Sequence, residues 1–187
     1  MYILGINAYH ADGSAVLLRD GELVVALEEE RFRRIKHWAG FPSAAIARCL
    51  DFAGIHGSDV QHVAISRDPK ANLMRKAAFA IGNRMSVSNI INRTRNLRKV
   101  QESRGPLAAA LNVAESRLPE IHFVEHHPSH LASAFFVSPF DDAAVAAIDG
   151  FGDYISTSTA LGQGNRLEIL DKVSYPHSLG VFYTAVT

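Results

Sequence analysis

The chain has 187 residues, of which 48% are hydrophobic and 20% are charged, and its 19 basic and 19 acidic side chains give a formal net charge of zero. This composition is typical of a globular protein, and the balanced charge excludes the strong positive field that general binding to nucleic acid or to an anionic membrane would need. The single cysteine, Cys49, cannot form an intrachain disulfide, and no apolar run reaches transmembrane length. We therefore expect one or two domains in the cytoplasm, without a targeting segment before the first apolar run.

The first part of the chain predicts three strands followed by a helix and a fourth strand. The three apolar runs typical of strands are residues 2–6, 14–18 and 23–27. An Asp20-Gly21 turn joins the second run to the third, as in a β-hairpin. Apolar residues at helical spacing over residues 43–52 predict a helix with Ser43 as its N-cap, and residues 60–65 predict the next strand.

The middle of the chain is expected to be largely helical, and residues 143–187 then repeat the order of three strands and a helix seen in residues 2–52. Residues about 70–104 are expected to be partly helical, a further helix is expected over residues 106–117, and a strand begins at Ile121. Three more strands are then predicted at residues 143–148, 156–161 and 167–173. The final segment, residues 178–185, reads as the start of a helix. The repetition is one of pattern, since the two copies share little residue identity.

A duplicated β-β-β-α unit predicts an α/β protein of the actin-like type, in which two ribonuclease-H-like halves clasp a nucleotide. We expect the first half over residues 1–140, with a helical insertion at about 69–118, and the start of a truncated second half over residues 141–187. Because the second half stops as its first helix begins, its strand edges would be poorly covered. We therefore expect the chain to be the N-terminal part of a longer protein.

Three histidines in the run His126-His127-Pro128-Ser129-His130 form the most informative motif. The run follows an apolar strand, and a helix that begins near Pro128 would place His126 at the strand end and His130 in the first turn. Asp149 ends the apolar run 143–148, so its carboxylate is expected at the edge of a sheet where ligands bind. Two imidazoles and a carboxylate that converge in this way predict a divalent-metal site. A single histidine is more often a surface or core residue than a metal ligand. Three histidines within five positions are harder to explain as surface or core residues.

Two loops of the first half carry further candidate residues. His10 and Asp12 lie between the first two strands and supply an acid/base pair, although a polar hairpin would need the same residue types. Lys36 precedes a helix, where its ammonium group can hold a phosphate, although a solvated charged face is the simpler interpretation of residues 28–37. In the second half, the backbone at Gly150 and Gly152 is suited to close approach of a phosphate.

Together these residues resemble the O-carbamoyltransferase family, which includes nodulation-factor and antibiotic carbamoyltransferases. The matching pieces are Leu4-Gly5-Ile6-Asn7 with Asp12 and Ser14-Ala15, Glu28-Glu29-Glu30-Arg31-Phe32, Lys36-His37 with Gly40-Phe41-Pro42, His126-His127-Pro128-Ser129-His130 with Ala132-Ser133-Ala134-Phe135, Asp149-Gly150-Phe151-Gly152-Asp153, and Tyr175-Pro176-His177-Ser178-Leu179-Gly180. They span nearly all of the chain and are specific in combination. In one departure, Ala11 stands directly before Asp12 where many members have histidine, and His10 lies one position earlier.

The resemblance implies an enzyme that uses ATP and carbamoyl phosphate to make a carbamoyl-adenylate and passes the carbamoyl group to a hydroxyl of a sugar or antibiotic-like molecule. It implies a divalent, iron-like metal held by His126 and His130, with Asp149 nearby and another aspartate ligand beyond Thr187. It further implies a C-terminal adenylate-forming domain as partner, without which we expect residues 1–187 to be inactive. The residues expected to contact carbamoyl phosphate or nucleotide are Lys36, His127, Gly150, Gly152 and Asp153, and the expected catalytic residues are His10 and Asp12.

Two other functions remain open from the sequence. A sugar kinase of the same fold is one, but simple phosphoryl transfer has no role for the histidine run. A nucleic-acid-binding module is the other, because the segment from Arg75 to Arg104 is strongly basic. That segment has almost no aromatic residues on which bases could stack, so no nucleic-acid partner is expected.

Overall fold

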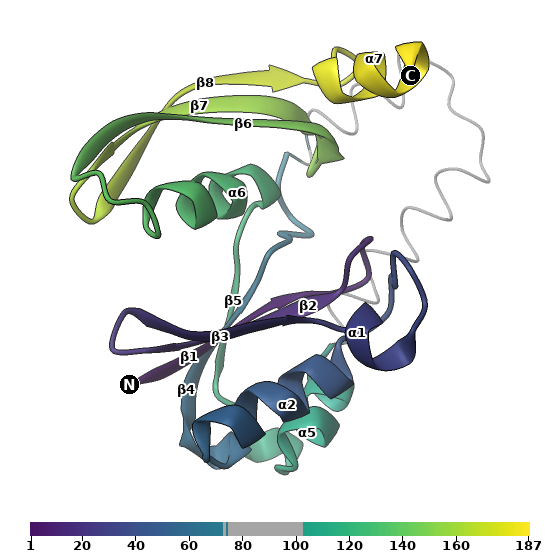
Figure 1. Ribbon diagram of the computed structural model, residues 1–187, viewed down its shortest axis with the longest axis vertical. Coiled ribbons are helices and arrows are strands. Elements are labelled where there is room, and N and C mark those ends of the chain that lie inside the picture. Colours follow the sequence, from purple (N-terminus) through teal and green to yellow (C-terminus); the bar gives the residue numbers. More distant parts are fainter. Residues whose placement is uncertain (73, 75–102) are drawn as a thin grey trace. The chain divides into compact units, whose positions relative to one another are not determined.

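The computed structural model describes residues 1–72, 74 and 103–187. The described residues form two compact units (Figure 1). Unit 1 contains residues 1–69 and 103–123, and unit 2 contains residues 70–72, 74 and 124–187. In this described part, no helix is long and apolar enough to cross a membrane. The basic segment from Arg75 and most of the predicted helical insertion lie outside the described residues.

Unit 1 is built on a five-stranded sheet in the order β3-β2-β1-β4-β5. Its strands are β1 (Tyr2–Asn7), β2 (Ser14–Arg19), β3 (Glu22–Glu28), β4 (Val60–Ile65) and β5 (Glu120–Phe123). The first three strands form an antiparallel meander, whereas β4 runs parallel to β1 and β5 parallel to β4. The predicted hairpin turn is present, with positive φ angles at Asp20 and Gly21 that suit a type I′ turn. This topology confirms the α/β prediction and is the one expected of a ribonuclease-H-like half.

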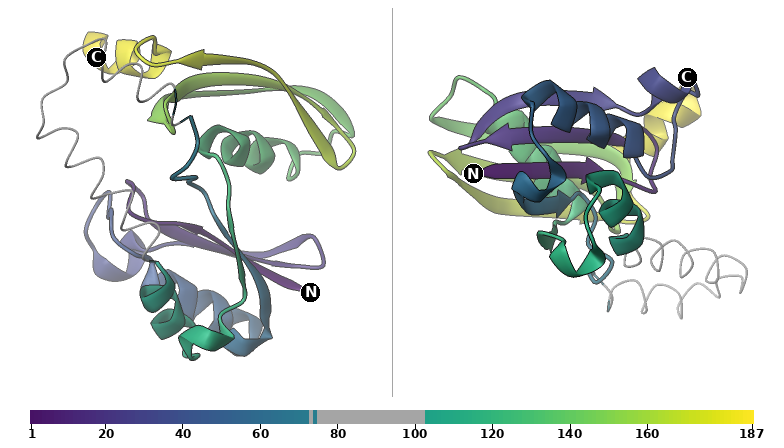
Figure 2. Two further views of the ribbon diagram at one scale, coloured as in Figure 1. Left: turned by 180° about the vertical axis from the view of Figure 1, so that it is seen from behind. Right: turned by 90° about the horizontal axis from the view of Figure 1, so that it is seen from below.

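The helices α2 (Ser43–Ala53) and α5 (Arg104–Leu111) lie against the same face of this sheet (Figure 2). Alternate residues of the strands face them, because successive side chains of a strand point to opposite faces. The resulting core contains Leu4, Leu17, Ile46, Val63 and Leu107, all completely buried. Short helical turns complete the unit: α1 (Glu30–Arg33), η1 (Gly57–Asp59) and η2 (Glu115–Arg117). Cys49 lies in the same core, as predicted, and burial raises the pKa of its thiol to about 11.

The N-terminus of α2 is held by a glutamate from another segment of the chain. The helix begins at Ser43 with Pro42 in the capping position, so the prediction of Ser43 as the N-cap is wrong. Instead Glu29, which is completely buried, accepts hydrogen bonds from the backbone N–H groups of Ala44 (3.2 Å) and Ala45 (2.8 Å). It also accepts a hydrogen bond of 2.7 Å from Arg33 Nε. The carboxylate thus satisfies two N–H groups that the first turn of a helix leaves without partners.

Replacing Glu29 by alanine should lower the free energy of unfolding of unit 1 by about 2–3 kcal/mol, because two buried N–H groups and Arg33 lose a charged partner. Fluorescence of Trp38, the only tryptophan, reports on this unit during urea denaturation. The matched control is Glu22→Ala, since Glu22 is exposed at the start of β3. Equal denaturation midpoints for the two variants would mean that Glu29 contributes no more than a solvated charge.

Unit 2 consists of an antiparallel sheet, in the order β6-β7-β8, and two helices. The elements are α6 (His126–Phe135), β6 (Asp142–Gly152), β7 (Ile155–Gln163), β8 (Arg166–Ser174) and α7 (Leu179–Val186). Helix α6 packs on β6 and β7 (Figure 1). Leu131 and Phe135 of the helix belong to a small core that also contains Val145 and Ala160. Because of this packing α6 belongs with the second sheet, and the division between units falls after Phe123 instead of at the expected residue 140.

Candidate functional site

Two histidines of α6 and an aspartate of β6 converge in unit 2. The helix begins at His126 and not near Pro128, so His126 and His130 lie one turn apart on the same side of α6. His126 Nε2 lies 2.8 Å from Asp149 Oδ2 and 2.9 Å from His130 Nε2. His130 Nε2 lies 3.9 Å from the same carboxylate oxygen. The side chains of His126, Asp149 and His130 are 12%, 32% and 50% exposed, so the cluster is anchored at one side and open to solvent at the other.

Asp149 reaches the histidines from an irregular part of its strand. The pairing of β6 with β7 shifts register between Ile148 and Gly152, and Asp149 falls within this shift. The strand was expected to end at Asp149, but it continues irregularly to Gly152. Such an irregularity redirects a side chain that regular pleating would place otherwise. The Asp149 carboxylate is therefore aimed at α6 by the local backbone.

The donor atoms of this cluster fit a divalent metal ion. Tetrahedral ligands that lie about 2.0–2.2 Å from an ion are roughly 3.3 Å from one another. The three separations in the cluster, 2.8, 2.9 and 3.9 Å, lie on either side of this value. One ring nitrogen of His126 faces both a carboxylate oxygen and a second imidazole nitrogen. A single proton on this nitrogen cannot make a good hydrogen bond to both neighbours. A cation would satisfy all three donors together. The imidazole and carboxylate ligands suit Fe²⁺, Zn²⁺ and related ions.

The electrostatics keep Asp149 ready to act as an anionic ligand. Burial alone would raise the pKa of Asp149. Hydrogen bonds from His126 and from the backbone N–H of Gly150, together with the nearby imidazoles of His126 and His130, outweigh burial and lower this pKa overall. The carboxylate is consequently ionised at neutral pH.

Gly150, Gly152 and Asp153, which were predicted to contact phosphate, all contact members of the His126–His130–Asp149 cluster. A side-chain carbon at Gly152 would lie only 1.8 Å from His126 Cδ2, so glycine leaves the space that the imidazole fills. The Gly150 N–H donates to Asp149 Oδ1 at 2.6 Å. Asp153 Oδ2 accepts a hydrogen bond of 3.1 Å from the His126 N–H, which caps the start of α6.

His127 lies inside unit 2, not at an accessible position for a phosphate. Its side chain is 1% exposed, and its Nε2 donates to the carbonyl oxygen of Ile155 at 3.0 Å. Burial lowers the pKa of His127 and keeps the ring neutral. His127 therefore links α6 to β7 and helps to fix the helix that carries the two candidate ligands.

Sequence reasoning assigned no role to Ser178 and Gly180, which fasten the start of α7 to the Asp149 segment. Ser178 Oγ lies 3.0 Å from the carbonyl oxygen of Asp149 and 2.8 Å from that of Gly150. A side-chain carbon at Gly180 would lie 2.5 Å from the Asp149 carbonyl oxygen, so only glycine permits this approach. A serine two residues before a glycine at the start of a helix can be recognised in a sequence. The contact of Ser178 with Asp149 cannot, because it depends on the tertiary fold.

In unit 1, the predicted catalytic Asp12 pairs with a histidine that the sequence did not single out as catalytic. Asp12 Oδ1 lies 2.8 Å from His37 Nδ1, and both side chains are more than half exposed. The Asn7 amide donates to the carbonyl oxygens of Ala11 and Asp12 and so shapes this loop. His10 is half-buried in the same loop.

The loop that contains Asp12 is joined by its backbone to the loop that contains Lys36 and His37. The Gly13 N–H donates to the Trp38 carbonyl oxygen at 2.8 Å, and the Tyr9 N–H donates to that of Gly40 at 3.3 Å. Lys36 is exposed in the second of these loops. Unit 1 therefore presents a carboxylate–imidazole pair and, one residue from that imidazole, an exposed ammonium group.

The family model described as "Carbamoyltransferase N-terminus" matches residues 2–187. The chain belongs to the carbamoyltransferase family. It is 41% identical to the uncharacterized protein sll1178 of Synechocystis, in a match that covers all of this chain and 31% of sll1178. It is 35% identical to the nodulation protein NolNO of Sinorhizobium fredii over 95% of the chain and 25% of that protein. The chain thus spans about a quarter to a third of the length of these relatives.

Among solved structures, the chain is similar to YeaZ from Pseudomonas aeruginosa. The identity is 17%, the TM-score is 0.47, and the match covers 94% of this chain and 67% of YeaZ.

Proposed function

We propose that the protein transfers a carbamoyl group from a carbamoyl-adenylate, formed from carbamoyl phosphate and ATP, to a hydroxyl of a sugar or antibiotic-like small molecule. Membership of the carbamoyltransferase family supports the reaction class. The observation that carries the proposal is the convergence of His126, His130 and Asp149, which the alternative of a sugar kinase does not require.

In the transfer step, the acceptor oxygen forms a bond to the carbamoyl carbon, and the bond from that carbon to the phosphate oxygen of AMP breaks. The hydroxyl proton passes to a base and AMP departs with the bonding electron pair. A divalent ion held by His126, His130 and Asp149 would supply a Lewis acid for phosphate or carbonyl oxygens. Its identity is proposed to be Fe²⁺ or a similar ion, because the donors are imidazole and carboxylate.

The chain's own residues are assigned to the other requirements of this step. Asp12 accepts a hydrogen bond from His37 and orients its imidazole, and an oriented imidazole is an efficient general base. His10, in the same loop, is the alternative base. Lys36 balances phosphate charge from the loop beside His37.

The proposal is tested by incubating the full-length protein with ATP, carbamoyl phosphate and a panel of sugars and aminoglycoside-like acceptors. Mass spectrometry should detect a carbamoylated acceptor together with AMP. The variant His126→Ala with His130→Ala should give no product above background. A phosphorylated acceptor together with ADP would overturn carbamoyl transfer in favour of a sugar kinase.

Replacing Lys36 by methionine should lower kcat/KM for carbamoyl phosphate roughly ten- to a hundredfold, because a charge-assisted hydrogen bond of about 1.5–3 kcal/mol is lost. The matched control is Arg34→Met, which removes an exposed cation two residues away. Identical kinetics for the two variants would place Lys36 on a solvated face without a role in binding.

A further inference from the structure

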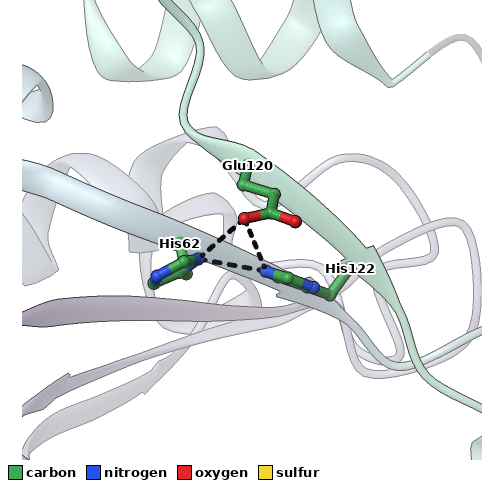
Figure 3. A group of neighbouring side chains, drawn as sticks. All are labelled: His62, Glu120 and His122. Carbon is green, nitrogen blue, oxygen red and sulfur yellow. Dashed lines mark hydrogen bonds and ion pairs between the residues drawn. The ribbon is translucent and has the colours of Figure 1, made fainter.

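A second group of potential metal ligands lies in unit 1, on neighbouring strands of its sheet (Figure 3). His62 is on β4, and Glu120 and His122 are on β5. The parallel register pairs His62 with Glu120 and Ala64 with His122. Since side chains two residues apart on a strand share a face, all three side chains project from the same face of the sheet.

The donor atoms of this group lie at ligand-like separations. His62 Nδ1 is 3.0 Å from His122 Nε2 and 3.6 Å from Glu120 Oε2, and His122 Nε2 is 3.9 Å from the same oxygen. These distances surround the roughly 3.3 Å expected between ligands of a tetrahedral zinc ion. Two imidazole nitrogens and one carboxylate oxygen thus point toward a common centre, as Figure 3 shows.

The surroundings of the group allow an ion to enter. The side chains of His62, His122 and Glu120 are 34%, 44% and 67% exposed. The backbones that carry them are hydrogen-bonded strands, which hold ligands more precisely than loops do. Because all three side chains are partly exposed, a water molecule can serve as the fourth ligand, as in zinc sites with three protein ligands.

We propose that His62, Glu120 and His122 bind a zinc ion that ties the edge strand β5 to β4. This site is separate from the His126–His130–Asp149 centre and does not depend on the proposed carbamoyl transfer. β5 is only four residues long and pairs through one edge with β4. Few backbone hydrogen bonds therefore join β5 to the sheet. A metal ion coordinated by side chains of both strands would add a further link between β4 and β5.

The test uses the variant His126→Ala with His130→Ala as the parent, so that zinc binding in unit 2 is removed. Calorimetric titration of the purified chain with zinc should show about one equivalent in this parent. Adding His62→Gln and His122→Gln should weaken binding by more than about a hundredfold, because two ligands are lost and even supporting residues of metal sites contribute ten- to a hundredfold. Adding His177→Gln should leave the affinity unchanged, since His177 is an exposed histidine outside both clusters.

A second measurement does not depend on affinity. Zinc should slow hydrogen exchange of the β5 amides in the parent and leave their exchange unaltered in the variant with His62→Gln and His122→Gln. Unchanged circular dichroism is required of that variant, and the single variant Glu120→Gln, at an exposed edge position, replaces it if the double change unfolds the chain. Equal zinc affinity in the folded variants and the parent, or no zinc binding in the parent, would overturn the proposal.

Discussion

Replacing Gly152 by alanine should abolish metal binding at the His126–His130–Asp149 centre. The new methyl carbon would lie 1.8 Å from Cδ2 and 2.1 Å from Cγ of the His126 ring, far inside contact distance. The ring therefore has to leave its position, which breaks its 2.8 Å contact with Asp149. Because a ligand is displaced outright, we expect the affinity for Fe²⁺ or Zn²⁺ to fall by more than about a hundredfold.

Gly150→Ala is the matched control for this variant. A methyl carbon at Gly150 meets no other atom within 4 Å, and the backbone N–H that donates to Asp149 is retained. Metal analysis of the full-length protein after gel filtration should show full occupancy in Gly150→Ala and none in Gly152→Ala. To separate this centre from the zinc site on β4 and β5, both variants carry His62→Gln and His122→Gln. Equal occupancy in the two glycine variants would mean that His126 is not a ligand.

The convergence of His126, His130 and Asp149 was accessible to sequence reasoning because the two imidazoles are close in the sequence. His126 and His130 are four residues apart, and any helix through this segment brings them to one side. The placement of Asp149 after an apolar run was enough to suggest the third donor. The supporting roles of Gly152 and Asp153 depend instead on how β6 returns against α6, and periodicity within one element holds no information on such packing.

The hairpin at Asp20-Gly21 and the order of elements were likewise predicted, because turn chemistry and apolar periodicity are encoded within a few residues. Glu29 was missed for the opposite reason. It stands in a run of charged residues that resembles a solvated face, yet it is buried by α2, whose first turn needs an acceptor. The His62–Glu120–His122 group was missed because its members are joined only by strand pairing across about sixty residues.

The pairing of Asp12 with His37 is a further contact that the sequence could not specify, because 25 residues separate the partners. Sequence reasoning placed His10 with Asp12 because both lie in the loop between the first two strands and because many family members have a histidine next to this aspartate. In the structure the carboxylate contacts His37 Nδ1, which leaves Nε2 as the nitrogen able to accept a proton. This arrangement makes Asp12 the orienting residue and His37 the base in the proposed transfer.

Asp12→Asn and His37→Gln should each lower kcat of the full-length enzyme by about 10² to 10⁴, the usual contribution of a general base. The double variant should be little worse than either single variant, since residues that act as a unit are not additive. His10→Gln, in the same loop, is the matched control and should retain most of the activity. Rates measured with saturating carbamoyl phosphate, ATP and acceptor separate these effects from binding. Loss of activity in His10→Gln with normal rates in His37→Gln would assign the proton transfer to His10, and Asp12 would then only shape the loop.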